Sequence, residues 1–446
     1  MSVGLGGEFF VPEDCLPVGE FKRIVLKPNW VLHASSPAFP IDALVTSASL
    51  IEAVIHACFE KYHQIDSLIV GDVPLQSCDF DLMLMQSRIN PVKERCSQKY
   101  GSRVKFLDLR RERYRQIDGY LELDSCADGD PAGYAEVVLD ERSQLEEVSH
   151  RAETFRVSDY DPEETKSVHH QGSHRYLIAR SVLEADLVIN LPKMKTHQKS
   201  AVTGALKNLV GINGSKAYLV HHQLGKPSSG GDEFPEDAPR ATVWQVRMRE
   251  ILQKRSPWLF RFAKSLWELY KRARGIKTLG TRENLEKGKV YIGAGSWYGN
   301  DSIWRMVYDL NLILLFARPE GGALAAVPQR RVISIMDGMI AGEGNGPLQP
   351  LPVEVGVVMA SENPFLVDFA MAKMMGFDWR KIRILANHKR FGWDVFADFD
   401  PHGFAVEVDG RLETRGVDSI PVVKSFIPPP GWRGHVELET CSYDRK

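Results

Sequence analysis

The sequence predicts an α/β fold with a mostly parallel sheet flanked by helices. Short runs of β-branched residues alternate with longer stretches that carry apolar residues at helical spacing. Hydrophobic residues make up 43% and charged residues 26% of the 446 residues, a composition that excludes general disorder. A chain of this length is able to bury a large core divided among two or three subdomains.

The first part of the chain reads as one layer of that sheet. Strands are expected at residues 23–26, 67–70 and 104–107, and helices at residues 47–62 and 80–100. The acidic, alternating stretch from Tyr120 to about Tyr160 predicts an antiparallel excursion from the sheet.

The middle of the chain holds the densest polar chemistry. A strand is expected at residues 186–190, and a polar loop follows it. A short helix then begins at Thr203, whose hydroxyl is a suitable N-cap.

Residues 240–277 differ in composition from the rest, with eleven Lys or Arg residues and two Glu residues. Apolar and aromatic residues recur among them at helical spacing, which predicts a basic amphipathic helical insert over residues 240–285. The insert separates the N-terminal part of the core, 1–239, from the C-terminal part, 286–446. Its face is expected either to contact an anionic membrane or, with equal weight, to pack on the core.

The α/β pattern then resumes. Strands are expected at residues 290–294, 332–336, 353–359 and 404–408, with helices from about residue 300 and at residues 364–375. A glycine-rich loop is expected at residues 337–347.

Charge and cysteine spacing narrow the class of protein. The net charge of -2 gives no overall footprint for nucleic acid, so no nucleic-acid partner is expected. The six cysteines stand far apart without a C-x-x-C pair, so no iron-sulfur cluster is expected. Without a secretion signal or a long apolar run, we expect a cytoplasmic protein, peripheral on the inner face of the membrane if the insert binds lipid.

Polar residues follow several predicted strands, where parallel sheets bind their ligands. If these strands are parallel and adjacent, the polar residues converge on one rim. The substrate-binding candidates are Lys27, Asn29, Asp72, Lys193, Lys195, Thr196, Thr203, Asn208, Asn300, Asp301 and Asn345. For Asn300 and Asp301, the alternative is that one of them caps the following helix.

The segment from Lys193 to Gly211 combines four lysines, His197 and a helix start. Cations and free backbone N–H groups favour a phosphate or a carboxylate. A lysine at position 207, surrounded by other cations, would have a lowered pKa and could serve as a nucleophile or proton carrier. The alternative is a loop whose lysines are merely solvated.

Four residues are catalytic candidates: Asp337, Glu343, His197 and Lys207. The two carboxylates lie in the glycine-rich loop and are able to act as acid and base or to bind a metal. The alternative is a tight connection in which Asp337 caps a neighbouring element. His221, His222 and Asp232 are weak metal candidates, and a divalent metal or a nucleotide-type cofactor stays open.

Six motifs in order resemble the domain-of-unknown-function 362 family, from about residue 20 to residue 390. They are KPNWV from Lys27, INLPKMKTH from Ile189, TGALKNLVG from Thr203, YGNDSIWR from Tyr298, DGMIAGEGNGP from Asp337 and NPFLVDFAMAKMMGFD from Asn363. The resemblance implies little about function. Many members carry a Cys-rich ferredoxin-type domain, which this chain lacks.

Two further similarities bear on function. The stretch HHQLGKPSSGGDEFP is similar to family members encoded among genes for surface polysaccharide synthesis. A more distant similarity to the nickel-dependent lactate racemase superfamily implies a lysine that holds a modified nucleotide, with Lys207 as the candidate. The histidine pattern of that superfamily is not evident here.

The leading prediction is an enzyme of unknown reaction that binds an anionic, phosphate- or carboxylate-bearing substrate at a Lys- and His-rich rim, in surface polysaccharide or lipid-linked glycan metabolism. The alternative is a non-catalytic module that recruits a phosphorylated glycan or a partner protein to the membrane surface. In both cases residues 240–277 would face an anionic membrane.

Overall fold

The computed structural model describes residues 15–117, 120–126, 128–157, 160, 162–240, 243–244, 247–248, 293–391, 400–408 and 411–439. Most of the insert predicted at residues 240–285, and most of the strand predicted at 290–294, lie outside these residues. Of the helices that the structure describes, none is long and apolar enough to cross a bilayer.

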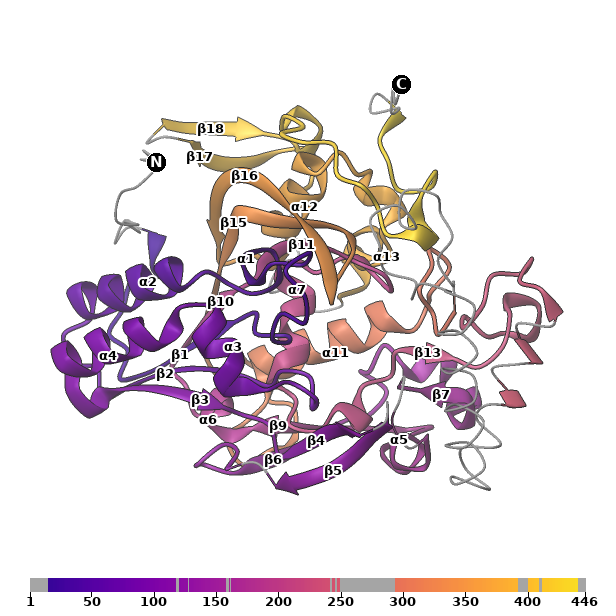
Figure 1. The fold of residues 1–446 in the computed structure, drawn as a ribbon, viewed down its shortest axis with the longest axis horizontal. Coiled ribbons are helices and arrows are strands. Elements are labelled where there is room, and N and C mark those ends of the chain that lie inside the picture. The colour runs from indigo at the N-terminus through magenta and orange to yellow at the C-terminus, as the bar shows by residue number, and fades with distance from the viewer. Residues whose placement is uncertain are drawn as a thin grey trace.

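The centre of the fold is a sheet with the strand order β12-β11-β15-β10-β1-β2-β3, in which β16 also pairs with β15 (Figure 1). Its strands are β1 (Arg23–Pro28), β2 (Ser67–Asp72), β3 (Val104–Asp108), β10 (Leu187–Leu191), β11 (Lys193–His197), β12 (Ala201–Val202), β15 (Arg331–Asn345) and β16 (Gln349–Ser361). Only β12 and β16 run antiparallel to their neighbours among these pairs. The predicted mostly parallel α/β sheet is confirmed.

Apolar side chains cover both faces of the sheet, because successive residues of a strand point to opposite sides. Val25 and Val188 belong to one buried cluster, whereas Ile24 and Leu187 belong to the other. The first cluster includes α11 (Ile303–Phe316) and α12 (Pro364–Met374), and the second includes α2 (Ala48–Lys61) and α4 (Ile89–Tyr100). Figure 1 shows α2 and α4 together at the left of the molecule.

Smaller sheets surround this core. They are formed by β4 (Glu112–Ile117) with β5 (Tyr120–Cys126), by β14 (Gly322–Ala323), β6 (Tyr134–Leu139), β9 (Ser173–Ala179) and β8 (His169–His170), by β7 (Phe155–Arg156) with β13 (His222–Gln223), and by β17 (Phe404–Val408) with β18 (Arg411–Arg415). Antiparallel pairing of β4 with β5 and of β6 with β9 confirms the predicted excursion, which continues beyond residue 160.

The remaining helices are short. The α-helices are α1 (Ile41–Leu44), α3 (Phe80–Gln86), α5 (Pro162–Val168), α6 (Arg180–Leu183), α7 (Gly204–Asn208) and α13 (Arg383–Ala386). The 3-10 helices are η2 (Gly101–Arg103), η3 (Glu146–Thr154), η4 (Leu209–Ile212), η5 (Lys216–Tyr218), η6 (Pro227–Ser229), η7 (Trp379–Lys381), η8 (His388–Phe391), η10 (Val417–Ser419) and η11 (Pro430–Trp432).

The helical structure predicted over residues 80–100 is confirmed, as two helices, α3 and α4. Arg88 lies between the two helices with a φ of 61°, in the left-handed region. Pro91 therefore falls in the first turn of α4, where its missing N–H costs no helical hydrogen bond.

The glycine-rich loop predicted at residues 337–347 is instead strand. β15 continues to Asn345 and pairs with β16 along this length, with an irregularity between Gly338 and Ile340. The glycines permit close packing rather than a turn. A Cβ on Gly342 would lie 2.7 Å from Pro350 Cβ and 2.8 Å from Ala43 O.

The two predicted parts of the core share one sheet. β15 comes from the C-terminal part and lies between β10 and β11 of the N-terminal part. The residues that follow β1, β2 and β10 therefore meet residues of β15 and β11 at the same edge.

Candidate functional site

An ion pair and a chain of amides join the ends of β1, β2 and β10. Lys27 Nζ lies 2.9 Å from Asp72 Oδ1 and donates to Asn208 Oδ1 at 3.2 Å. Asn208 also receives a hydrogen bond from Asn29 Nδ2 and donates one to Asn190 Oδ1, each at 2.7 Å. Because β1 pairs in parallel with β10, Lys27 lies directly beside Asn190. The predicted gathering of Lys27, Asn29, Asp72 and Asn208 is therefore observed.

A second buried ion pair joins β11 to β15. Lys193 Nζ lies 2.9 Å from Asp337 Oδ2, and each side chain is at most 1% exposed. The backbone N–H of Ser47 donates to the same carboxylate oxygen at 2.7 Å. Asp337 therefore holds a lysine and the start of α2 in place.

Two further buried lysines, Lys195 and Lys207, have no carboxylate partner among the described residues. Lys195 is fully buried and donates to the carbonyl oxygen of Leu44 at 2.6 Å. Burial, with the charges of Lys193 and Lys207, lowers the pKa of Lys195 well below its usual value. Lys207 is 7% exposed. Burial, with Lys216, Lys199 and Lys27 nearby, lowers its pKa to about 7.

We call Lys27, Lys193, Lys195, Lys199, Lys207 and Lys216 the lysine cluster. Lys216, which sequence reasoning did not single out, donates to the carbonyls of Val73 and Val210, and burial lowers its pKa to about 7. The carboxylates that pair with the cluster in the described part of the chain are Asp72 and Asp337. Among the described residues, Lys195 and Lys207 therefore have no carboxylate to offset their charge.

Two histidines border the lysine cluster. His197 Nδ1 accepts from the backbone N–H of Lys199 at 3.0 Å, so the hydrogen of its neutral ring lies on Nε2. His221 Nδ1 lies 2.7 Å from the carbonyl oxygen of Leu219, which only accepts, so its Nε2 carries a lone pair. Burial, followed by nearby lysine charge, holds both pKa values well below the usual range.

The predicted cap of α7 by Thr203 is wrong. The carboxylate of Asp368, from α12, accepts from the backbone N–H groups of Ala205 and Leu206. An anionic ligand therefore cannot use these groups, which the sequence had suggested for it. The Thr203 hydroxyl is buried without a hydrogen-bond partner in the described structure, and the Thr203 N–H donates to Lys195 O at 2.9 Å.

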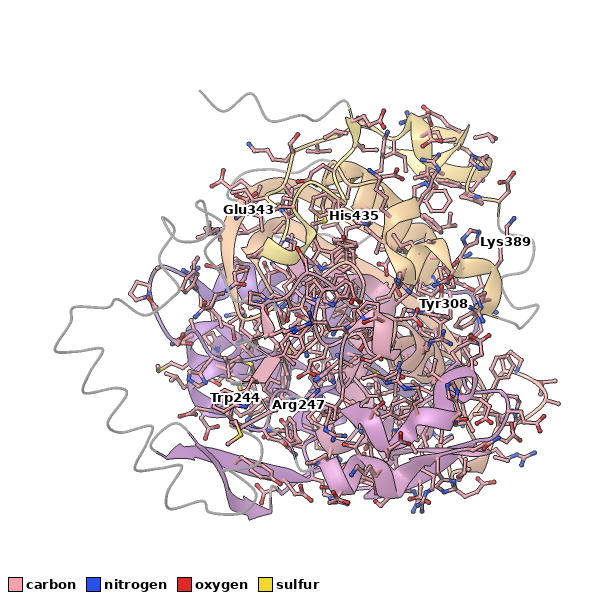
Figure 2. All side chains as sticks on the ribbon, turned by 90° about the vertical axis from the view of Figure 1, so that its right-hand side faces the viewer. Trp244, Arg247, Tyr308, Glu343, Lys389 and His435 are labelled. Atoms are coloured by element: carbon pink, nitrogen blue, oxygen red, sulfur yellow. The ribbon has the colours of Figure 1, made fainter. Side chains whose placement is uncertain are left out.

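Other candidate residues bind local structure. Thr196 Oγ1 donates to the Gly344 carbonyl at 3.1 Å, and Asn345 Oδ1 accepts from Gln198. Glu343 Oε2 accepts from the backbone N–H of Ile427, and Figure 2 shows Glu343 near the top of the molecule. Asp337 pairs with Lys193, whereas Glu343 accepts from Ile427, so the two carboxylates have different partners.

The sequence alternative for Asn300 is observed. Asn300 Oδ1 accepts from the N–H groups of Ser302 and Ile303 at the start of α11. Asp301 forms ion pairs with Arg305 and Arg383. Both residues thus stabilise the helix and its surroundings.

The metal candidates do not gather. Asp232 accepts from Gln223, Asp301 and Ser302, so its carboxylate is already used. Within the described residues, no group of three or more His, Cys, Asp or Glu side chains is arranged to hold a metal ion. His222 is buried, and its Nδ1 has no hydrogen-bond partner there.

A cavity of about 560 Å³ lies elsewhere, beside α13. Its lining residues are Trp379, Arg380, Ala386, His388, Lys389, Asp400, Pro401 and His402. None of them belongs to the lysine cluster, and Figure 2 shows Lys389 at one edge of the molecule.

Comparison with known proteins identifies the family. Residues 123–373, more than half of the chain, match the family described as domain of unknown function (DUF362). The thylakoid-associated protein sll1697 of Synechocystis sp. is 23% identical over 216 residues, which are 48% of this chain and 40% of that protein. The match therefore spans less than half of that relative, and no solved structure matches the chain. On the family match, the chain belongs to the domain-of-unknown-function 362 family.

Proposed function

We propose that the protein is an enzyme that binds a phosphate- or carboxylate-bearing substrate at the lysine cluster. The observation that carries this proposal is the burial of Lys195 and Lys207 without a carboxylate partner among the described residues. An uncompensated buried charge is costly, so a lysine there either loses its proton or binds an anion. An anionic ligand beside Lys195 would offset this cost.

Two more groups support a ligand at this edge of the sheet. The buried Thr203 hydroxyl and the buried Asn29 Oδ1 have no hydrogen-bond partner in the described structure. Native proteins rarely leave such groups unpaired. The Thr203 N–H donates to Lys195 O, so Thr203 lies beside the strand that carries Lys195.

Calorimetric titration with inorganic phosphate and with acetate tests the binding step. We expect binding by the wild-type protein, and affinity reduced about 10- to 100-fold in Lys195→Met and Lys207→Met, because each removes a charged hydrogen bond. Lys105→Met is the matched control, since Lys105 lies exposed on β3. Equal affinity in all four proteins would contradict the proposal.

We also propose that the substrate comes from surface polysaccharide or lipid-linked glycan metabolism at the cytoplasmic side of a membrane. The basic residues 240–277 are the segment that would bind anionic lipid. The similarity to a thylakoid-associated protein of Synechocystis supports contact with a membrane.

The burial of Lys195 and Lys207 without a carboxylate partner among the described residues also fits a second candidate. This candidate is a non-catalytic module that recruits a phosphorylated glycan or a partner protein to a membrane. Sedimentation with phosphatidylserine vesicles and with phosphatidylcholine vesicles tests membrane binding. Salt-sensitive binding to the anionic vesicles alone is expected, and absence of binding at low salt would contradict both membrane proposals.

A further inference from the structure

We propose that Lys207 forms an imine with an aldehyde or ketone that also carries a phosphate or carboxylate group. This inference rests on the proposed anion site and adds the reacting atom. It assigns the protein a carbonyl-bearing substrate and a covalent intermediate.

Lys207 differs from the other members of the lysine cluster in its contacts. Lys27 and Lys193 form ion pairs with carboxylates. Lys195, Lys199 and Lys216 donate to backbone carbonyl groups. For Lys207, the described part of the structure holds neither an ion pair nor a hydrogen bond to Nζ, although its side chain is only 7% exposed.

The state of the amine suits nucleophilic attack. A lysine attacks a carbonyl carbon only through the lone pair of its neutral form. Burial and the neighbouring lysines bring the pKa of Lys207 to about 7, so much of it is neutral at neutral pH. An exposed lysine would not attack a carbonyl in this way, because its amine stays charged at neutral pH.

The adjacent histidines offer opposite proton-transfer roles. His221 Nε2 presents a lone pair, whereas the neutral ring of His197 presents an N–H at Nε2. The charge of Lys207 lowers the pKa of both rings, which places them in its vicinity. One ring is therefore suited to accept a proton, and the other to donate one.

The chemistry balances without an oxidant or a reductant. The Lys207 nitrogen forms a bond to the carbonyl carbon, and the π electrons of the carbonyl move to oxygen. A proton leaves nitrogen for His221, and the oxygen receives a proton from His197, which gives a carbinolamine. Protonated His221 then gives its proton to the hydroxyl, which leaves as water as the C=N bond forms. The proton that remains on the nitrogen returns to His197, so both rings regain their starting state. The anionic group of the substrate is held by Lys195 and the Thr203 hydroxyl.

Borohydride trapping tests the inference. The full-length protein is incubated with glyoxylate, with glycolaldehyde phosphate or with propionaldehyde, reduced with sodium borohydride and mapped by peptide mass spectrometry. We expect one reduced adduct at Lys207, formed about 100-fold faster than at Lys105, because far more of the Lys207 amine is neutral. One of the anionic aldehydes should react faster than propionaldehyde, and which one does identifies the anionic group.

Variants separate this inference from the proposed anion site. Lys207→Arg keeps the charge and should lose the adduct while phosphate binding persists. Lys207→Met removes an unpaired buried charge and is expected to fold. If the arginine variant does not fold, Lys207→Met should lose the adduct completely, while its phosphate affinity falls only by about 10- to 100-fold. Phosphate binding with no preferential adduct at Lys207 would overturn the imine alone. A wild-type protein that neither binds phosphate nor forms the adduct would overturn the anion site as well.

Discussion

At the scale of single residues, partners decide which buried lysines are structural. Lys27 and Lys193 are each at most 1% exposed and are compensated by Asp72 and Asp337. Removing either partner would leave a buried charge, so these pairs hold the ends of the strands together. Lys207 has no such compensation among the described residues, so its amine is free for the proposed reaction.

The pKa of Lys207 predicts a pH dependence of stability. Its value falls from 10.5 in the unfolded chain to about 7 in the fold, so folding releases a proton between these pH values. Burial of the charge is fully penalised below pH 7, and the penalty disappears as the pH rises toward 10.5. Between pH 7 and pH 9, the wild-type free energy of unfolding should gain about 2 kcal/mol relative to Lys207→Met.

Urea denaturation of both proteins at the two pH values measures this gain. Both proteins keep Lys216, whose pKa is also about 7, so both curves contain its titration. A difference that falls with rising pH would contradict the assigned environment of Lys207.

At the scale of elements, the site depends on how α7 is anchored. The helix has five residues, too few to be stable alone, and the carboxylate of Asp368 accepts from two of its N–H groups. Asn208 at its last position ties it to β1 and β10. Asp368 thus anchors the start of α7 and Asn208 anchors its end, and Lys207 lies between these two anchors.

Removing the Asp368 carboxylate, which caps α7, should loosen that helix. Asp368→Ala is expected to lower the free energy of unfolding by about 2 kcal/mol, because two buried N–H groups lose their acceptor. Asp368→Asn keeps one acceptor oxygen and should lose less. Denaturation in urea checks the order, and an alanine variant as stable as the wild-type protein would show that the cap is dispensable.

The turn after α7 tests the packing of the Lys27–Asp72 pair. A Cβ on Gly211 would overlap the Asp72 carboxylate and lie 2.6 Å from Lys27 Nζ. Gly211→Ala should therefore destabilise the protein by about 2 kcal/mol or more. Gly403→Ala is the matched control, since a Cβ there meets nothing within 4 Å. Equal melting temperatures for the two variants would contradict the described packing.

Local sequence patterns predicted most elements of the core. The features that were missed depend on residues far away in the sequence. The strand at 186–190 and the helix at 364–375 were predicted within a residue or two, because runs of apolar residues are local signals. The continuation of β15 past Asp337 was missed, since its glycines indicate a loop until β16 supplies a partner. Asp368 was missed because its partners lie 162 and 163 residues away.

At the scale of the whole molecule, the site is built by interleaving distant parts of the chain. β15 separates β10 from β11, so Lys193 reaches Asp337 only when both parts of the core are present. The lysine cluster comes from residues 27–216 and its carboxylate Asp337 from beyond the insert. The sequence predicted this convergence from strand ends, but the partners of each lysine depended on strand order.

This interleaving predicts that residues 1–239 do not fold alone. Without β15, both β10 and β11 lose their shared neighbour, and the buried Lys193 loses its carboxylate. The isolated fragment should show no cooperative thermal transition by circular dichroism, with the full chain as control. A cooperative transition in the fragment would contradict the shared sheet.

Anomalous diffraction from crystals soaked in selenate, a tetrahedral oxyanion like phosphate, tests most directly whether the lysine cluster binds an anion. The account predicts a selenium peak within hydrogen-bonding distance of Lys195 Nζ, Lys207 Nζ and the Thr203 hydroxyl, weakened by competing phosphate. Selenium peaks confined to exposed lysines, with the cluster vacant at saturating selenate, would contradict it.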